Sequence, residues 1–253
     1  MKKLILLIIL FTIGNIFAQT NYLVIEGSDG RKTYGNVSDI EKLTFTTTFN
    51  CGDKLIYGND IYPTVLIGGK CWMAKNLNIG KRIDGSINQS SADPDIEKYC
   101  YNNLESNCDT YGGLYQWAEA VGYTNGATNT TSPSPAFSGN IQGICPNGWH
   151  IPSYSELEDF ITAVSFDGNA IKALGQGTGS GAGTNTSGFS ALFAGIGNGS
   201  GLFAGLGSDF LFWSATDYID NYSFGIELYY SVSGVSFSGN PKNYALSVRC
   251  VKD

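Results

Sequence analysis

The stretch that decides the fold is ICPNGWHIPSYSELEDF, residues 144–160. Ser153 and Glu156 stand three residues apart, as in the capping box that begins many helices. Apolar residues then follow at the i, i+3, i+4 and i+7 positions of one helix face: Leu157, Phe160, Ile161 and Val164. This pattern predicts an amphipathic helix that begins just after Pro152 and packs against a core.

The same stretch contains His150, the one histidine of the chain. Nucleophilic hydrolysis needs a base beside the nucleophile, so a catalytic role for this histidine has to be weighed. No G-x-S-x-G elbow accompanies it. His150 lies between Trp149 and Ile151 in an extended segment before the helix, and both neighbours favour burial. We therefore interpret His150 as a structural residue in a packed corner and expect the chain not to be an enzyme.

The N-terminus has the pattern of a secretory signal peptide over residues 1–18. Lys2 and Lys3 precede an apolar run, and Ala18 supplies the small residue before the cleavage point. Loss of the two lysines takes the formal net charge from −7 to −9. An acidic chain without a basic run is a poor partner for nucleic acid or an anionic membrane. No later segment is long and apolar enough to span a membrane, so we expect a secreted, periplasmic or cell-surface protein.

Six cysteines lie in the mature chain, and an even number in an exported protein implies disulfides. They are Cys51, Cys71, Cys100, Cys108, Cys145 and Cys250. The sequence alone leaves about 15 pairings open, and a metal cluster would require CxxC spacing and more histidines. Cys250 shares one strand face with Leu246 and Val248. Cys145, at the start of the predicted helix, is its most natural partner.

The sequence supports the other two pairs to different degrees. Cys100 and Cys108 close a short polar loop and form a local pair. Cys51 with Cys71 meets a geometric difficulty, because an ideal meander places them two strand spacings apart, about 10 Å, beyond the reach of a disulfide. Pro63 interrupts the strand between them, so the end that carries Cys51 can bend over and restore the pair.

The rest of the chain predicts short strands and loops. Residues 19–49 form a small N-terminal β module, and turns at Gly58-Asn59 and Gly68-Gly69 join the following segments into a meander. Residues 80–110 are predicted to be a polar loop. A second helix is indicated by the apolar positions Leu114, Trp117, Ala118 and Val121. The glycine-rich stretch 175–188 lacks the Lys-Ser/Thr ending of a phosphate-binding loop, and short strands follow it.

Six motifs occur along the chain in a fixed order: YPTVLIGGKCWMAKNLN, YGGLYQWAEA, ICPNGWHIPSYSELEDF, GFSALFAG, FWSATD and SVRCVKD. Residues 50–253, which contain them, resemble the Fibrobacter succinogenes major paralogous domain of exported Bacteroidetes and Fibrobacteres proteins. The resemblance implies an α+β, disulfide-tied, C-type lectin-like fold with two helices and a strand- and loop-rich C-terminal half. The helix segment is also similar to one in the formylglycine-generating sulfatase-modifying domain, although Leu157 stands where the family usually has tryptophan. The family brings no established activity.

The loop FWSATDYIDNY provides the candidate binding residues. It combines aromatic rings for stacking with carboxylate and amide oxygens: Trp213, Asp217, Tyr218, Asp220 and Asn221. Such oxygens are also calcium ligands, but the Glu-Pro-Asn and Gln-Pro-Asp signatures of calcium-dependent lectins are absent. Calcium binding and a plain solvated turn both stay open, and no other cofactor or metal is expected.

These observations predict a non-catalytic domain that binds an extracellular glycan or protein, or that serves as a structural part of the cell envelope. The alternative is an enzyme that acts on polysaccharide through two carboxylates. The available pairs come from Asp93 with Asp95, Glu158 with Asp159, and Asp217 with Asp220, besides Glu156. An enzyme should bring acids together in one cleft, whereas a binding protein should expose aromatic rings on a loop face.

Overall fold

The structure, a computed structural model, describes residues 22–26, 32–36 and 49–253. The chain divides into two units, Met1–Phe49 and Asn50–Asp253. The predicted signal peptide lies outside the described residues. Within the first unit, two strands of the predicted β module pair antiparallel. They are β1 (Tyr22–Glu26) and β2 (Lys32–Asn36).

The second unit begins with the two predicted hairpins. Their strands are β3 (Leu55–Tyr57), β4 (Asp60–Tyr62), β5 (Thr64–Ile67) and β6 (Lys70–Met73). The prediction of one continuous meander is wrong, because β3–β4 and β5–β6 belong to different sheets. Pro63 separates them, and its missing N–H and fixed backbone angle favour a break in the ladder at that point.

This break also resolves the difficulty with Cys51 and Cys71. The two residues form a disulfide with a Cα–Cα distance of 5.5 Å, well below the separation in an ideal meander. The end that carries Cys51 bends toward β5, where the Gly52 N–H donates to Thr64 Oγ1 at 3.0 Å. The pairs Cys100–Cys108 and Cys145–Cys250 are confirmed as well. All six cysteines are therefore disulfide-bonded.

The helices agree only in part with the sequence pattern. They are α1 (Glu105–Tyr111), α2 (Trp117–Ala120), α3 (Tyr154–Ala163) and α4 (Gly168–Ile171). The capping box of α3 is confirmed: the Ser153 hydroxyl accepts from the Glu156 N–H, and the Glu156 carboxylate accepts from the Ser153 N–H at 2.8 Å. The second predicted helix is shorter than expected, because Tyr115 and Gln116 pair with a distant strand instead. Helix α1 occupies part of the predicted polar loop.

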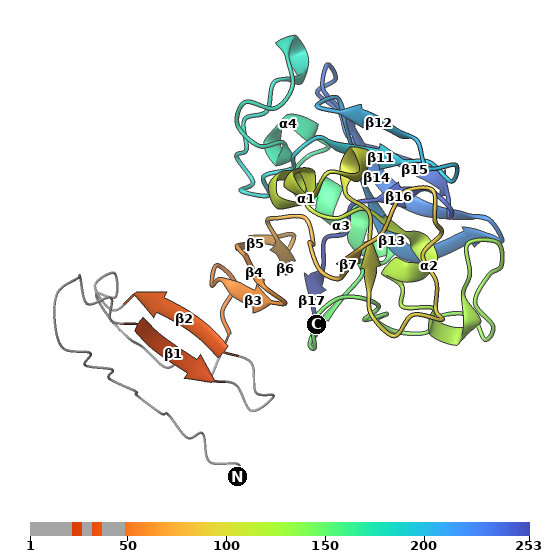
Figure 1. The fold of residues 1–253 in the computed structure, drawn as a ribbon. Helices are drawn as coiled ribbons and strands as arrows, with labels where there is room; N and C mark the ends of the chain where they lie inside the picture. Colours follow the sequence, from red (N-terminus) through yellow and green to blue (C-terminus); the bar gives the residue numbers. More distant parts are fainter. Residues whose placement is uncertain (1–21, 27–31, 37–48) are drawn as a thin grey trace, which may run out of the picture. The chain divides into compact units, whose positions relative to one another are not determined.

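Three larger sheets complete the unit, in the orders β10-β17-β6-β5, β12-β11-β16-β9 and β13-β14-β15, and β7 pairs parallel with β8 (Figure 1). The remaining strands are β7 (Lys81–Arg82), β8 (Glu97–Lys98), β9 (Tyr115–Gln116), β10 (Trp149–His150), β11 (Ala194–Gly197), β12 (Phe203–Leu206), β13 (Asp209–Ile219), β14 (Tyr222–Tyr229), β15 (Ser236–Pro241), β16 (Ala245–Leu246) and β17 (Val251–Lys252). Strand β17 pairs with β6, so the last strand joins the sheet that holds the second hairpin.

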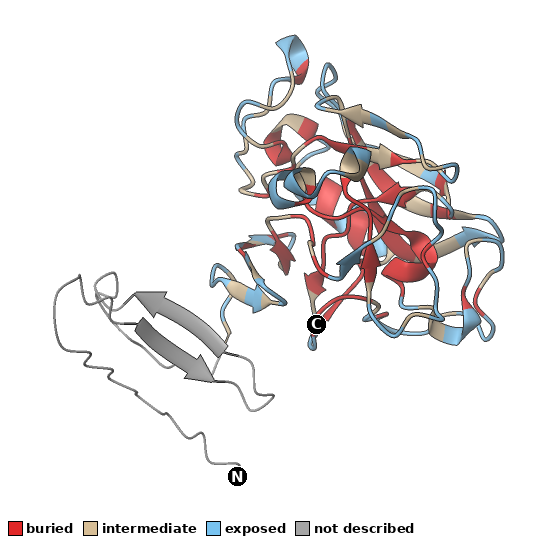
Figure 2. Ribbon diagram, in the orientation of Figure 1, coloured by how far each residue is buried: buried red, intermediate tan, exposed pale blue. Residues whose placement is uncertain are grey.

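The main core lies where α3 packs against the strands around it, and Figure 2 shows buried residues along these elements. Its centre is aromatic: the ring of Phe160 lies 4.8 Å from that of Trp72 and 4.7 Å from that of Phe189. The core also encloses Arg249, which is 1% exposed and stacks its guanidinium 4.1 Å from the Phe189 ring. Burial lowers the pKa of Arg249 to about 9. Its donors meet the Asn76 side chain at 2.7 Å and backbone carbonyls, so Arg249 is buried like its neighbours Val248 and Cys250.

Candidate functional site

His150 belongs to a closed cluster of charges, which we call the junction: His150, Glu156, Asp253 and Lys70. The imidazole Nε2 lies 2.9 and 3.0 Å from the two Glu156 carboxylate oxygens, and Nδ1 lies 2.6 Å from Asp253 Oδ1. Lys70 Nζ reaches Glu156 at 3.1 Å. Only 2% of His150 is exposed. Four segments meet here: β10, the start of β6, the first turn of α3 and the C-terminus.

The junction stabilises the charged form of the histidine. Burial lowers the pKa of His150, but hydrogen bonds and charge attraction from Glu156 and Asp253 outweigh burial, and the net pKa is raised above its usual value. Burial raises the pKa of Glu156, yet His150 and the Ser153 N–H bring that pKa down to about 2. A doubly protonated imidazole donates from both nitrogens and has no lone pair to accept a proton. The geometry agrees with a structural role.

The loop predicted to carry the binding residues is the end of a β-hairpin. Strand β13 continues to Ile219, and β14 begins at Tyr222, so Asp220 and Asn221 form the turn. Trp213 lies in the middle of β13, is buried, and donates its indole N–H to the Tyr115 carbonyl at 2.7 Å. It is a core residue and cannot contribute a stacking surface to this site.

Asp217 is engaged by a buried lysine. The Lys242 ammonium forms an ion pair with the Asp217 carboxylate and donates to the Asp220 carbonyl at 2.9 Å. It also lies 4.3 Å from the centre of the Trp117 ring. The carboxylate and the carbonyl that would suit a calcium ion thus surround an ammonium group, whose positive charge repels a divalent ion. Asp217 fits a structural role under the hairpin.

Tyr218 is an exposed aromatic residue near the turn of the hairpin, with 55% of the residue accessible to solvent. Its ring centre lies 4.6 Å from that of Phe224, and the ring covers the backbone of Gly239. Phe224 contacts Tyr154 at 4.6 Å, and Tyr154 contacts Phe237 at 4.7 Å. We call Tyr218 together with these three supporting rings the aromatic platform. Asn221 lies exposed at the adjacent turn.

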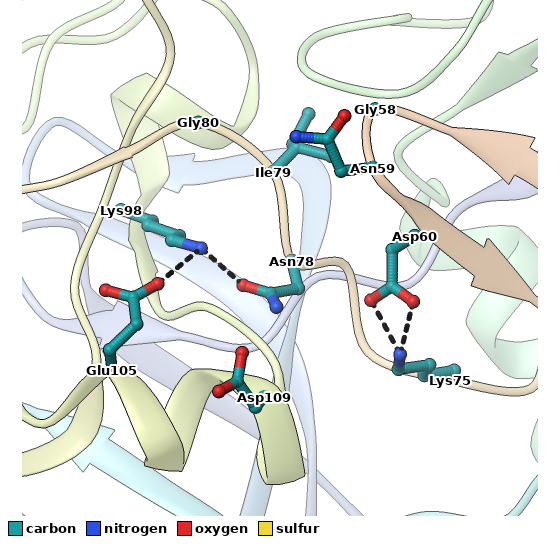
Figure 3. A pocket seen from close by; sticks show the side chains of 10 residues that line it. All are labelled: Gly58, Asn59, Asp60, Lys75, Asn78, Ile79, Gly80, Lys98, Glu105 and Asp109. Carbon is teal, nitrogen blue, oxygen red and sulfur yellow. Dashed lines mark hydrogen bonds and ion pairs between the residues drawn. The ribbon is translucent and has the colours of Figure 1, made fainter. Parts of the chain in front are cut away.

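A pocket of about 440 Å³ opens at another place in the unit (Figure 3). We call it the polar pocket, and its charged and amide side chains are Asn59, Asp60, Lys75, Asn78, Lys98, Glu105 and Asp109. Figure 3 shows Lys75 bridged to both Asp60 oxygens, each at 2.6 Å. Lys98, with a side chain only 8% exposed, donates to Asn78 Oδ1 at 2.7 Å and pairs with Glu105 at 3.3 Å.

Sequence reasoning missed the polar pocket. Its residues come from the β3–β4 turn, the segment after β6, the end of β8 and helix α1. No local pattern joins them. The pairing of Cys100 with Cys108 was predicted, but only as the closure of a local loop. In the structure this disulfide holds the short segment in which α1 presents Glu105 and Asp109.

A second pocket, of about 460 Å³, is lined by uncharged side chains between residues 88–91 and 123–129. Most of its amides already bond within the protein. The Gln89 side chain accepts from the Gln116 N–H at 2.6 Å and donates to the Glu97 carbonyl at 2.9 Å. Asn129 accepts from the Ala118 N–H and donates to the Gln116 side chain. Few of its polar groups are left for a ligand.

The carboxylate pairs named from the sequence do not form a cleft. Asp93 pairs with Lys81 at 3.5 Å, while Glu158 and Asp159 lie exposed on α3. The fold brings other acids together, among them Asp60, Glu105 and Asp109 in the polar pocket. Across the described residues, one trio of metal-ligating side chains converges, Cys100, Glu105 and Cys108, and its two sulfurs are joined in a disulfide.

The fold and these sites define a disulfide-tied domain of mixed α and β structure. The chain belongs to the Fibrobacter succinogenes major domain family, whose model matches residues 65–252. No curated protein and no solved structure matches the chain. Within the described ranges, no helix combines the length and apolar composition needed to cross a membrane.

Proposed function

We propose that this chain is an exported, non-catalytic recognition domain that binds an extracellular glycan on the aromatic platform. The observation that carries the proposal is the Tyr218 ring, which is exposed yet held in place by Phe224 and Gly239. A tyrosine that is already ordered loses little conformational entropy on binding, and its flat apolar face suits the C–H face of a sugar ring. The three disulfides support an oxidising, extracytoplasmic location.

A C-type lectin-like fold forms part of the proposal. Its support is the arrangement of the family domain, in which early strands β5 and β6 share a sheet with the last strand, β17, and with β10. Helix α3 packs beside this sheet, and the binding hairpin projects from the strand-rich C-terminal half. Binding in this chain would proceed without calcium, because Lys242 already neutralises Asp217.

A polysaccharide-acting enzyme is the second candidate. One observation favours it: Glu105 and Asp109 lie one turn apart on α1, and both line the polar pocket opposite Asp60. Residues four apart on a helix share a face. Against it, Asp60 is bridged to Lys75, and Glu105 contacts both Lys98 and Arg82. Release of reducing ends from a panel of polysaccharides, lost in Glu105→Gln and Asp109→Asn, would favour the enzyme.

The binding proposal is tested with the oxidised protein on a glycan array, followed by affinity electrophoresis in gels that contain the polysaccharides identified. Tyr218→Ala should weaken binding at least tenfold, about 1.4 kcal/mol. Tyr230→Ala is the matched control, because Tyr230 is 44% exposed and lies outside the platform. An array without any bound glycan, or equal binding by wild type and Tyr218→Ala, would overturn the proposal.

A further inference from the structure

We infer that the polar pocket is a second binding site and that its ligand is a sugar unit bearing a primary amine. The inference extends the proposed glycan function to a place remote in sequence from the Tyr218 hairpin. It concerns a small soluble ligand, whereas the aromatic platform suits the face of a glycan chain. The two sites can therefore be tested separately.

The first support is the construction of the pocket. Its volume of about 440 Å³ lies within the range of small-molecule sites. Each wall is fixed: the Lys75–Asp60 pair ties the segment after β6 to the β3–β4 turn, and the Cys100–Cys108 disulfide anchors α1. At Gly80 a Cβ atom would lie 2.2 Å from the Ile96 carbonyl oxygen, so the backbone there packs too closely for any larger residue. A pocket with fixed walls binds without a large ordering cost.

The second support is the balance of charge inside the pocket. Two lysines face three acids. Lys75 is paired with Asp60, and Lys98 with Glu105, which Arg82 also contacts at 3.3 Å. Asp109 has no ion-pair partner among residues 49–253 of the described structure. Asp109 is therefore the carboxylate left for a ligand, and an ammonium group on the ligand would complement it.

The third support is the set of hydrogen-bonding groups around that charge. Asn59 and Asn78 present amides, and Figure 3 shows the Asn78 amide beside the Lys98 ammonium, while the Asn59 side chain lies apart from it, near Ile79. The Asn78 amide oxygen accepts from Lys98, which leaves its N–H₂ group free to donate to a ligand. Such alternating donors and acceptors match ring hydroxyls. An anionic sugar would meet Asp109 as a like charge, and an alkyl amine would leave the amides without partners.

The inference is tested by titrating the oxidised full-length protein with glucosamine, glucose and N-acetylglucosamine at pH 6, with amide NMR shifts as the readout. Glucosamine should bind at least tenfold more tightly than glucose, and the perturbed amides should map to residues 58–60, 75–80 and 98–109. Asp109→Asn should remove the preference for the amine. Asp159→Asn, an exposed acid on α3, is the matched control and should keep it.

Four results would overturn the inference: no binding of glucosamine, equal affinities for the three sugars, a preference that survives Asp109→Asn, or perturbations outside the pocket. Calcium chloride alone is titrated in parallel, and pocket shifts with calcium that match those with glucosamine would also count against the amine. Failure here is distinguishable from failure of the platform. Tyr218→Ala should bind glucosamine as wild type does, and Asp109→Asn should keep its affinity for the polysaccharide.

Discussion

The junction and the polar pocket are built from the same kinds of side chain but differ in what those side chains leave free. Each brings acids and bases together from segments far apart in sequence. In the junction, both nitrogens of His150 meet carboxylates and the ring is enclosed. In the pocket, 8% of the Lys98 side chain is exposed, and Lys98 borders about 440 Å³ of open volume and an acid that has no cation partner within residues 49–253.

The difference shows that the reactive character of a residue type is a poor guide to its role. His150 attracts attention as the single histidine, yet its partners satisfy it completely and the cluster contributes to stability. Nothing in the sequence distinguishes Asp109 from other acidic residues, yet in the structure it lines a pocket that a ligand can enter. Substitutions in the junction should therefore destabilise the fold, whereas substitutions in the pocket should change binding with little effect on stability.

The largest expected effect comes from the disulfide beside the junction. Cys145–Cys250 closes a loop of 105 residues, and Cys100–Cys108 beside the pocket closes one of 8. Loop-closure entropy gives about 4.7 kcal/mol for the former and about 2.5 kcal/mol for the latter. Replacing each pair with alanines should lower the free energy of unfolding in that order, measured in urea without reductant. Equal losses, or the reverse order, would show that chain entropy does not govern this pair of bridges.

The sequence predicted the corner around the junction because the determinants of that corner are local, but it did not predict the charged partners of His150. The Ser153–Glu156 capping box, the apolar positions of α3 and the position of Cys145 before the helix all lie within 20 residues, and each is confirmed. The face shared by Leu246, Val248 and Cys250 is buried as well. The pattern did not predict that Arg249, between Val248 and Cys250, is buried as well. Its burial depends on backbone carbonyls from a distant loop, which the local sequence does not reveal.

The pocket could not be predicted in the same way. Helix α1 has no apolar face for a periodicity to reveal, since Cys108 is its single buried residue. The pattern at residues 114–121 predicted too long a helix because the partner of Tyr115 and Gln116 lies about 130 residues later, in β16. Lys98 looks like a solvated residue until β7 and α1 cover it. Tertiary pairing, which a single sequence does not show, decides each of these cases.

The next effect is that of His150 itself. His150→Ala leaves Glu156 and Asp253 without their shared partner, and breaking a buried ion pair on one side costs about 3 kcal/mol. Thermal and urea unfolding at pH 6 should show the loss. Lys98→Met is the contrasting control from the pocket. A loss below about 1 kcal/mol for His150→Ala would mean that water or Lys70 replaces the imidazole.

The contribution of the junction to the free energy of unfolding should also change with pH, by less than the loss caused by His150→Ala. The raised pKa of His150 makes its contribution complete below its unfolded value of 6.5, and that contribution is lost as the pH rises through the folded pKa. The lowered pKa of Glu156, about 2, makes its contribution complete above its unfolded value of 4.5 and lost on acidification. The junction should therefore stabilise the wild-type protein most between pH 4.5 and pH 6.5, the two unfolded values. The difference in unfolding free energy between wild type and His150→Ala, followed from pH 3 to pH 9, should peak there, and a flat difference would remove the junction as its source.

The smallest effect on stability is expected for a substitution in the polar pocket. This result would distinguish the pocket most clearly from the junction. Lys98→Met keeps the apolar stem of the side chain and removes the ammonium. Glu105 remains solvated, with 54% of its side chain exposed, and still contacts Arg82 at 3.3 Å, so it is not left as a buried, unpaired charge. The free energy of unfolding should therefore change by less than about 1 kcal/mol, while the affinity for glucosamine rises at least threefold, because the ammonium group that occupies Asn78 and Glu105 and repels a cationic ligand is gone. If Lys98→Met unfolds as readily as His150→Ala, the pocket is a structural cluster like the junction and not a binding site.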